Sequence, residues 1–244
     1  MEIRKLSDNI SVQAPYTALL YCPPGVGKST TIGLIAERSE GKTLILDVDR
    51  TVDKTLAKGE IVKDISRIDT VKIDTANTFD DWTRTIAELN MMKESGNLEY
   101  TTIAVDNISE LERGILSDLG FKGKTKGVPC QGDYQTMQFK LVNSLRFMKT
   151  WGCNIVWTAW EDARSIVYPD GTSYSQICPK ISAKIVDNIC GLCDVVGKIM
   201  AKQDGTRGII LEATANIYAK NQIDSRKGCL VEDFTNFNVK ENGV

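Results

Sequence analysis

Residues 21–30 read Tyr-Cys-Pro-Pro-Gly-Val-Gly-Lys-Ser-Thr and constrain the fold of this chain more than any other segment. They follow an apolar run at residues 18–20 and precede residues 31–36, which have the composition of a helix. In a strand, loop and helix of this kind, backbone N–H groups point at a phosphate. The Lys28 ammonium adds charge beside the β- and γ-phosphate oxygens, and the Ser29 hydroxyl is placed to bind Mg²⁺. The segment therefore predicts a loop that binds ATP or GTP. The residues expected to contact the nucleotide are Pro24, Gly25, Val26, Gly27, Lys28, Ser29 and Thr30.

Cys22 stands where the pattern G-x-x-x-x-G-K-[ST] has its leading glycine. Pro23 follows it, and a residue before proline favours the β or polyproline region, where a side chain is tolerated. A plain turn between strand and helix is the alternative interpretation. A thiol beside Lys28 and a helix N-terminus has a lowered pKa when solvent reaches it. We therefore expect Cys22 to be alkylated quickly in the free protein and to be protected by Mg-ATP.

Apolar strands alternate with amphipathic helices over most of the chain, and we expect them to form one α/β domain. This alternation is typical of a mainly parallel sheet covered on both faces, with ligands at the carboxyl ends of its strands. After residue 160 we expect two hairpins, around 167–174 and 195–211, with a helix at 182–190 between them. The other expected strands are 17–22, 42–47, 68–73, 101–106 and 153–159, and the other expected helices are 28–38, 78–95, 108–119 and 134–150.

The composition limits the possible functions. The chain has no histidine, which excludes Ser-His-Asp and Cys-His hydrolytic sites and leaves acid–base chemistry to carboxylates. The net charge of −2 restricts any nucleic-acid contact to a local basic patch. No apolar run approaches ~18 residues, residues 1–8 lack the apolar core of a signal peptide, and seven cysteines are scattered without a disulfide-like spacing. We therefore expect a cytoplasmic protein with no membrane partner.

Asp106 ends an apolar strand at residues 101–106. In a protein with a phosphate-binding loop, an acid at this place is the expected partner of Mg²⁺. The alternative is that Asp106 only caps the helix that begins at Ile108. Glu110 is expected to be a solvated residue of the first helical turn. The expected metal residues are therefore Ser29 and Asp106.

Asp47 and Asp49 end the strand at residues 42–47 and alternate along it, so both can reach the carboxyl edge of the sheet. A nucleotide hydrolase without histidine needs a carboxylate to orient the attacking water. Asp49 is the first candidate and Asp47 the second. The alternative is a pair of acids that caps Thr51 and the residues after it.

Two further groups of residues invite a functional interpretation. Thr158 or Glu161, at the end of an apolar strand, is placed to sense a γ-phosphate, although such residues often only end a strand. Cys190 and Cys193 form a lone C-x-x-C that lacks two ligands for zinc, so buried cysteines are a better interpretation than a redox pair.

Basic residues gather in two places. The glycine-rich loop at 122–129 carries lysines that can neutralise phosphates, near tyrosines that can stack on bases; a solvated lysine loop is the alternative. Near the C-terminus, Lys220 and Arg226 can reach the γ-phosphate of a neighbouring subunit, or lie in a solvated turn. The candidate DNA-contacting residues are Lys122, Lys124, Lys126 and Tyr134, with Tyr168 and Tyr174 further along the chain.

With these segments in order, the chain resembles the RecA-type ATPase core, and more closely the short phage RecA-like ATPases linked to single-strand annealing and recombination. The resemblance covers about residues 15–232 and rests on residues 22–30, 44–49, 103–106 and 219–220. It implies a single RecA-like P-loop ATPase domain over residues 1–244, with ATP and Mg²⁺ as ligands and Asp49 as the acid that activates water. RecA carries a glutamate at the place of Asp49. The phage proteins usually follow Ala-Lys with Asp-Arg, where this chain has Asn-Gln.

The resemblance also implies partners. It predicts a homo-oligomer, as a ring or filament, with nucleotides at the subunit interfaces and single-stranded DNA bound by loops at 122–135 and 163–180. A single-strand-binding protein is a further expected partner, and a phage-encoded protein would work in the cytoplasm of the host.

Three functions are compatible with these residues. The first is a Mg-dependent ATPase of phage DNA recombination that binds single-stranded DNA and is stimulated by it. The second is a module that assembles with nucleotide and hydrolyses it negligibly, suggested by Cys22 and the short Asp49. The third is a small-molecule kinase, which ranks lowest because residues 120–135 supply lysines and no arginine for a phosphate lid.

Overall fold

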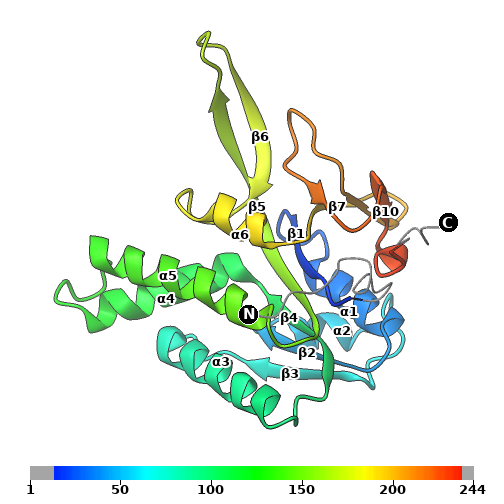
Figure 1. Ribbon diagram of the computed structural model, residues 1–244, viewed down its shortest axis with the longest axis horizontal. Coiled ribbons are helices and arrows are strands. Elements are labelled where there is room, and N and C mark those ends of the chain that lie inside the picture. Colours follow the sequence, from blue (N-terminus) through cyan, green and yellow to red (C-terminus); the bar gives the residue numbers. More distant parts are fainter. Residues whose placement is uncertain (1–13, 238–244) are drawn as a thin grey trace, which may run out of the picture.

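The computed structural model describes residues 14–237, which form alternating strands and helices followed by hairpins (Figure 1). The helices are α1 (Lys28–Arg38), α2 (Val52–Leu56), α3 (Thr78–Glu94), α4 (Ile108–Lys122), α5 (Gln131–Met148) and α6 (Val186–Leu192), with a 3-10 turn at Val231–Asp233. The strands are β1 (Thr17–Cys22), β2 (Lys42–Asp47), β3 (Ile68–Lys72), β4 (Tyr100–Asp106), β5 (Asn154–Val167), β6 (Ser173–Pro179), β7 (Val195–Ala201), β8 (Arg207–Ile210), β9 (Lys220–Asn221) and β10 (Gly228–Leu230).

The strands form one mostly parallel sheet in the order β10-β8-β7-β1-β5-β4-β2-β3. All neighbours from β7 to β3 are parallel, whereas β8 and β10 extend the β7 edge as antiparallel strands. Outside this order, β6 pairs with β5 and β9 pairs with β7, both antiparallel. The expected α/β fold, with a mainly parallel sheet and C-terminal hairpins, is confirmed.

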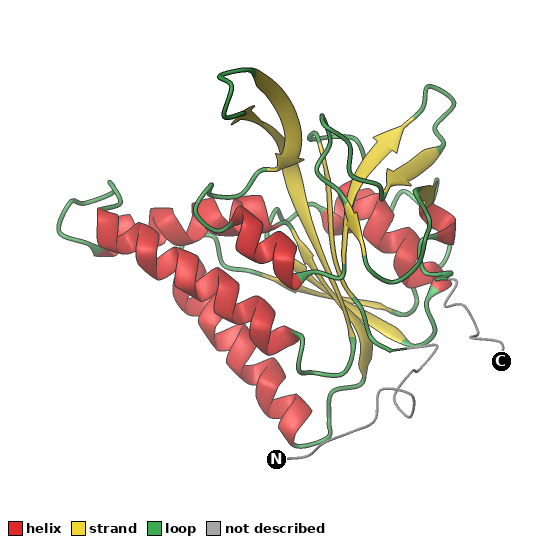
Figure 2. Ribbon diagram, turned by 45° about the horizontal axis from the view of Figure 1, so that its top comes forward, coloured by secondary structure: helices red, strands yellow, loops and turns green. Residues whose placement is uncertain are grey.

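Helices cover both faces of the sheet, which is visible between two helical layers in Figure 2. All six residues of β1 are buried because neither of its faces meets water. Leu19 and Tyr21 pack into a core layer with α3, α4 and α5. Leu20 and Cys22 point the other way and pack with α1 and α2. The central position of β1 fixes the loop that follows it at the carboxyl edge of the sheet.

Several elements differ from the expected ranges. β5 continues past Trp160 as far as Val167, because its outer half leaves the core and pairs with β6 as a two-stranded hairpin. α5 begins three residues earlier than expected, at Gln131, and α6 begins later, at Val186. α2 was not expected, because its five residues are too few to show a helical period. The hairpins at β5–β6 and β7–β8 are present as expected.

Three other expectations depend on which residues the structure describes. Within residues 14–237, no helix combines the length and the apolar character needed to cross a membrane. Residues 1–8, expected to lack a signal peptide, lie outside the described residues. The single domain expected over residues 1–244 also reaches beyond them and stays a prediction.

Candidate functional site

The loop between β1 and α1 has a backbone that only glycine accommodates easily. Gly25 and Gly27 have φ angles of 81° and 120°, in the left-handed region that favours glycine. A Cβ on Gly27 would also lie 2.6 Å from Nε of Arg207. α1 begins immediately at Lys28, and the Thr31 N–H donates to the Gly27 carbonyl at 2.8 Å. The N–H groups before that first bond have no intrahelical partner and are available to an anion.

Lys28 is buried, and no residue among 14–237 forms an ion pair with its ammonium group. Lys28 is 8% exposed and lines a cavity of about 500 Å³ together with Ser29, Thr30 and Asp49. Within residues 14–237 its ammonium makes no hydrogen bond or ion pair. A buried cation without a partner is unfavourable unless an anion neutralises it. The cavity therefore has the charge and the donors to bind an anionic ligand at Lys28.

Ser29 and Asp106 are in direct contact beside this cavity. The Ser29 hydroxyl donates to Oδ2 of Asp106 at 2.5 Å, and the Thr158 hydroxyl donates to Oδ1 at 2.6 Å. Asp106 is fully buried. Mg²⁺ in nucleotide sites uses one or two protein oxygens and completes its shell with waters and substrate phosphates. The hydroxyl and carboxylate present here fit that ion, and the described residues hold no cluster of three or more acidic or cysteine ligands that would suggest another metal.

Asn107, and not Asp106, caps α4. The Asn107 side-chain oxygen accepts a hydrogen bond from the Glu110 N–H at 2.9 Å, so the capping interpretation of Asp106 is wrong. The amide of Asn107 donates to Oδ2 of Asp49 at 2.6 Å. Sequence reasoning missed Asn107, although an Asn directly before a helix is a recognisable cap.

Asp47 and Asp49 have separate positions. Asp47 is fully buried and accepts hydrogen bonds from the N–H groups of Thr51 and Val52 at 3.2 and 3.3 Å. It stabilises the start of α2, as the capping alternative described. Asp49 lines the cavity, and its Oδ1 is buried without a hydrogen-bond partner among the described residues. Of the two acids, only Asp49 is placed to act on a ligand.

Burial raises the pKa of Asp49 to about 7. The nearby carboxylates of Asp106 and Glu110 raise this pKa as well, whereas the Lys28 ammonium and the hydrogen bond from Asn107 lower it. A carboxyl group with a pKa near neutrality can both take and release a proton under physiological conditions. Asp49 therefore has the proton affinity of a general base.

Arg207 is a cavity residue that sequence reasoning did not identify. It lies at the start of β8, lines the cavity, and donates from Nε to the Val26 carbonyl at 3.3 Å. No local pattern marks it, because an arginine after the hairpin turn at Asp204 and Gly205 is unremarkable in sequence. Only the pairing of β7 with β1 brings the hairpin to the loop.

The end of the cavity formed by α2 and the loop after it mixes apolar residues with polar ones, Thr55, Lys58 and Glu60 among them. Leu56, Ile61 and Val62 line this end. Gly33 of α1 makes room for them, since a Cβ there would lie 2.7 Å from Val62 and 2.8 Å from Leu56. The cavity thus joins a cationic end at the loop to an end with both apolar and polar side chains. An anionic ligand that also has an apolar part matches this distribution.

The expectation for the Cys22 thiol is wrong. Cys22 is fully buried, and that burial raises the pKa of its thiol to about 11, although the nearby Lys28 ammonium lowers it. Since solvent does not reach the thiol, the condition for a lowered pKa fails. Its place in β1 explains why a side chain is accepted there, because Cys22 packs into the layer that holds α1.

The other weaker candidates have structural partners. Thr158 holds Asp106, as described, and Glu161 forms an ion pair of 2.9 Å with Lys198. Neither lines the cavity. Cys190 and Cys193 are both buried and unpaired, in agreement with the expectation of buried cysteines.

Lys220 and Arg226 are held within the subunit. The Lys220 ammonium donates to carbonyls at the end of α6, the shortest being Cys193 at 2.6 Å. Arg226 pairs with Asp224 at 2.6 Å and donates to the Asp233 carbonyl at 2.8 Å. Both side chains lie outside the cavity of their own subunit. Their action on a neighbouring subunit stays a prediction.

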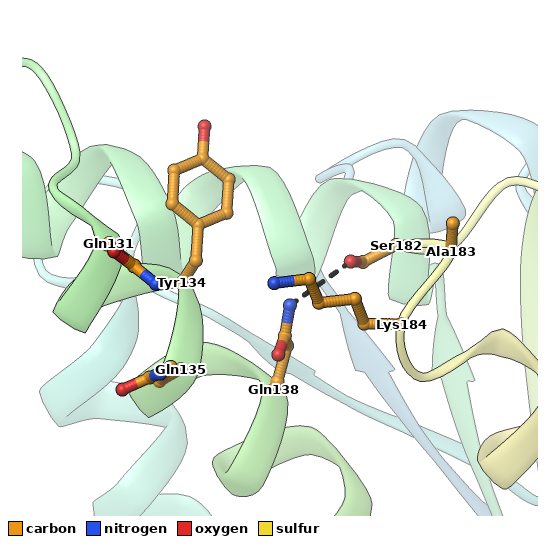
Figure 3. A pocket seen from close by; sticks show the side chains of 7 residues that line it. All are labelled: Gln131, Tyr134, Gln135, Gln138, Ser182, Ala183 and Lys184. Atoms are coloured by element: carbon orange, nitrogen blue, oxygen red, sulfur yellow. Dashed lines mark hydrogen bonds between the residues drawn. The ribbon is translucent and has the colours of Figure 1, made fainter.

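The candidate DNA-contacting residues separate into two groups. Lys122 forms ion pairs with Asp80 and Asp118 at the end of α4. Lys124 and Lys126 are exposed and have no ion pair among residues 14–237. Tyr134 lines a second pocket between α5 and the segment before α6, shown in Figure 3. The other lining residues are Gln131, Gln135, Gln138, Ser182, Ala183 and Lys184.

Comparison with known proteins gives one family. Residues 14–223 match the family described as AAA domain. No curated protein matches the chain. The matched segment contains every residue of the cavity that Lys28 and Asp49 line.

Proposed function

The chain belongs to the AAA domain family of P-loop nucleotide-binding ATPases, and on that premise we propose that it hydrolyses ATP in the cavity beside Lys28. The observation that carries this proposal is the buried Lys28, whose ammonium has no ion pair among residues 14–237. It lies beside a glycine loop, a hydroxyl–carboxylate pair and a carboxyl group of neutral pKa. These are the groups that phosphoryl transfer to water requires.

Each residue has a separate task in this mechanism. Lys28 and the loop N–H groups bind the phosphates and stabilise the negative charge that develops on them. Asp49 accepts a proton from the attacking water, and the Asn107 amide fixes the orientation of that carboxylate through its 2.6 Å hydrogen bond. Ser29 and Asp106 would hold Mg²⁺, which neutralises phosphate charge when bound. Leu56, Ile61 and Val62 would pack on the nucleobase.

The test is phosphate release from Mg-ATP by the wild type and by Lys28→Ala. We expect the substitution to lower turnover at least about a hundredfold, since a charged contact to the transferred group is lost. Lys54→Ala is the matched control, because Lys54 is an exposed lysine on α2 outside the cavity. Unchanged turnover in Lys28→Ala would place the site elsewhere.

We further propose that the ATPase acts on single-stranded DNA as a homo-oligomer in phage recombination. The resemblance to phage RecA-like ATPases supports this, together with three exposed side chains. Lys124 and Lys126 are exposed and have no ion pair in the described part of the chain, and Tyr134, beside the second pocket, is 45% exposed. Cationic loops with neighbouring aromatic rings bind single strands without sequence preference.

Anisotropy of a labelled single-stranded oligonucleotide measures this binding. Lys124→Ala with Lys126→Ala should weaken it and lower its salt dependence, because fewer counterions are released. Lys54→Ala with Lys93→Ala removes two exposed lysines elsewhere and serves as the control. Equal weakening by both double variants would leave no role for the 122–129 loop. Light scattering with and without nucleotide reports the oligomer.

A second function is favoured by one observation. The pKa of Asp49 near 7 leaves much of this carboxyl group protonated at neutral pH, so only part of the protein then holds the carboxylate that can accept a proton. A module that assembles with ATP but hydrolyses it negligibly would use the same cavity. Nucleotide-dependent oligomer size without phosphate release would support that function over the ATPase.

A further inference from the structure

Arg207 brings a second cation to the phosphate-binding loop from another part of the chain. Its Nε donates to the Val26 carbonyl at 3.3 Å, and its Nη1 donates to the Gly205 carbonyl at 3.2 Å. It lines the same cavity as Lys28. Its Nε lies 2.6 Å from the place that a Cβ on Gly27 would occupy. The guanidinium therefore stands against the turn that leads into α1.

The charge of Arg207 has no partner among the described residues. Arg84, Arg164 and Arg226 each pair with an aspartate, whereas no carboxylate of residues 14–237 lies within ion-pair distance of Arg207. Its two acceptors are neutral backbone carbonyls. A guanidinium has five N–H donors in a planar fork, so most of its donors are still available to a ligand.

We propose that Arg207 binds the phosphate chain of the nucleotide within its own subunit, with its guanidinium transferring from the Val26 carbonyl to phosphate oxygens. The inference rests on the proposed ATP site and adds a residue to it. A phosphate oxygen is a charged acceptor and a better partner for a guanidinium than a neutral carbonyl at 3.3 Å.

This contact would connect the nucleotide to the β7–β8 hairpin. β7 pairs directly with β1, the strand that ends at the loop, and Arg207 is paired with Ala201 across the hairpin. A shift of the guanidinium toward the phosphates would therefore be transmitted to both strands of the hairpin. The alternative is that Arg207 makes no contact with the nucleotide. It would then only hold the loop in place through its hydrogen bond to the Val26 carbonyl.

Calorimetric titration with the non-hydrolysed analogue AMP-PNP and Mg²⁺ separates these roles. Arg207→Met should lower the affinity about tenfold to a hundredfold, the range for one hydrogen bond to a charged group. Arg207→Lys should lose less affinity than Arg207→Met, because lysine keeps the positive charge. Lys202→Met removes an exposed cation from the same hairpin and should bind as the wild type does.

The salt dependence of the affinity for AMP-PNP distinguishes phosphate binding by Arg207 from a purely structural role. Between about 50 mM and about 500 mM sodium chloride, the difference in affinity between wild type and Arg207→Met should shrink, because screening weakens a contact between charges. If the loss of affinity is the same at both salt concentrations and equally large in Arg207→Lys, Arg207 only holds the loop in place, and the inference is wrong. Wild-type affinity in Arg207→Met would also overturn the inference. If the wild type itself binds no AMP-PNP, the proposed function fails first, and with it the premise of this inference.

Discussion

The Asn107 amide donates a 2.6 Å hydrogen bond to the Asp49 carboxylate across 58 positions of sequence. The bond forms because β2 and β4 are parallel neighbours, with Asp47 paired to Asp106 at their ends. The oxygen of the same Asn107 side chain accepts from the Glu110 N–H and caps α4. One side chain therefore holds the candidate base and the start of a helix in a fixed relation.

The pH dependence of turnover should report Asp49. Because its pKa in the free protein is about 7, kcat/KM for Mg-ATP should rise as the pH increases through about 7, where the carboxylate form that accepts a proton becomes dominant. Initial rates from pH 5 to pH 9 provide the measurement. A profile that is flat across neutrality would remove Asp49 from the role of base.

Asn107→Ser should shift the pH profile of kcat/KM for Mg-ATP to higher pH. Serine is a good helix cap, so α4 keeps its start, but the hydrogen bond that lowers the pKa of Asp49 is lost. The midpoint of kcat/KM should therefore lie higher than in the wild type, and the melting temperature should fall, because the partly buried Asp49 carboxyl loses a hydrogen-bond donor. A midpoint that stays in place would show that the amide does not influence the carboxyl group.

The raised pKa of Asp49 should also affect how the free energy of unfolding depends on pH. Asp49 has a raised pKa in the folded protein, so between about pH 4 and about pH 7 the folded state binds more protons than the unfolded state. The contribution of Asp49 to the free energy of unfolding therefore falls as the pH rises through this window. Relative to the wild type, Asp49→Asn should become more stable over the same interval and hold a constant difference above it. A difference that does not change with pH would contradict the raised pKa.

Thr158→Val should destabilise the protein through Asp106. The substitution keeps the shape of the side chain but removes the hydroxyl that donates to Oδ1 of this fully buried carboxylate. Leaving a buried acceptor unsatisfied costs about 1–3 kcal/mol. Urea unfolding measures the loss, and Thr158→Ser is the control, since it retains the hydroxyl and loses one methyl group worth about 0.8 kcal/mol. A larger loss in the serine variant would assign the effect to packing.

Alkylation should spare Cys22. Burial raises the pKa of its thiol to about 11 and keeps reagent away, whereas Cys130 is exposed before α5. Iodoacetamide labelling read by peptide mass spectrometry should modify Cys130 first and leave Cys22 unmodified with or without Mg-ATP. Rapid labelling of Cys22 that nucleotide prevents would restore the idea of an accessible thiol in the cavity.

The strand and helix pattern around the loop was readable from sequence because it is local. An apolar run, Gly25 and the sequence Gly-Lys-Ser-Thr lie within one short segment, and the strand expected at 17–22 and the helix expected at 28–38 match β1 and α1. The acids at the ends of β2 and β4 were also visible, since parallel strands present their carboxyl ends at one edge. What these residues do stays a prediction, but their convergence beside the loop follows from that rule.

The tertiary structure decided which of these residues have partners and which are left for a ligand. Asp47 accepts hydrogen bonds from the N–H groups at the start of α2, while Asp49 lines the cavity, a division that depends on the bend after β2. Arg207 lies 181 positions from Val26, whose carbonyl it contacts. No local sequence pattern predicts a contact between residues so far apart in the chain. The sequence by itself determined the α/β class, the phosphate loop and the exclusion of histidine chemistry, because each depends on residue type and short spacing. The cavity walls and the burial of Cys22 depend on strand order, because packing between distant segments decides which polar groups find partners. The same packing leaves Lys28 and Arg207 without an ion pair among residues 14–237.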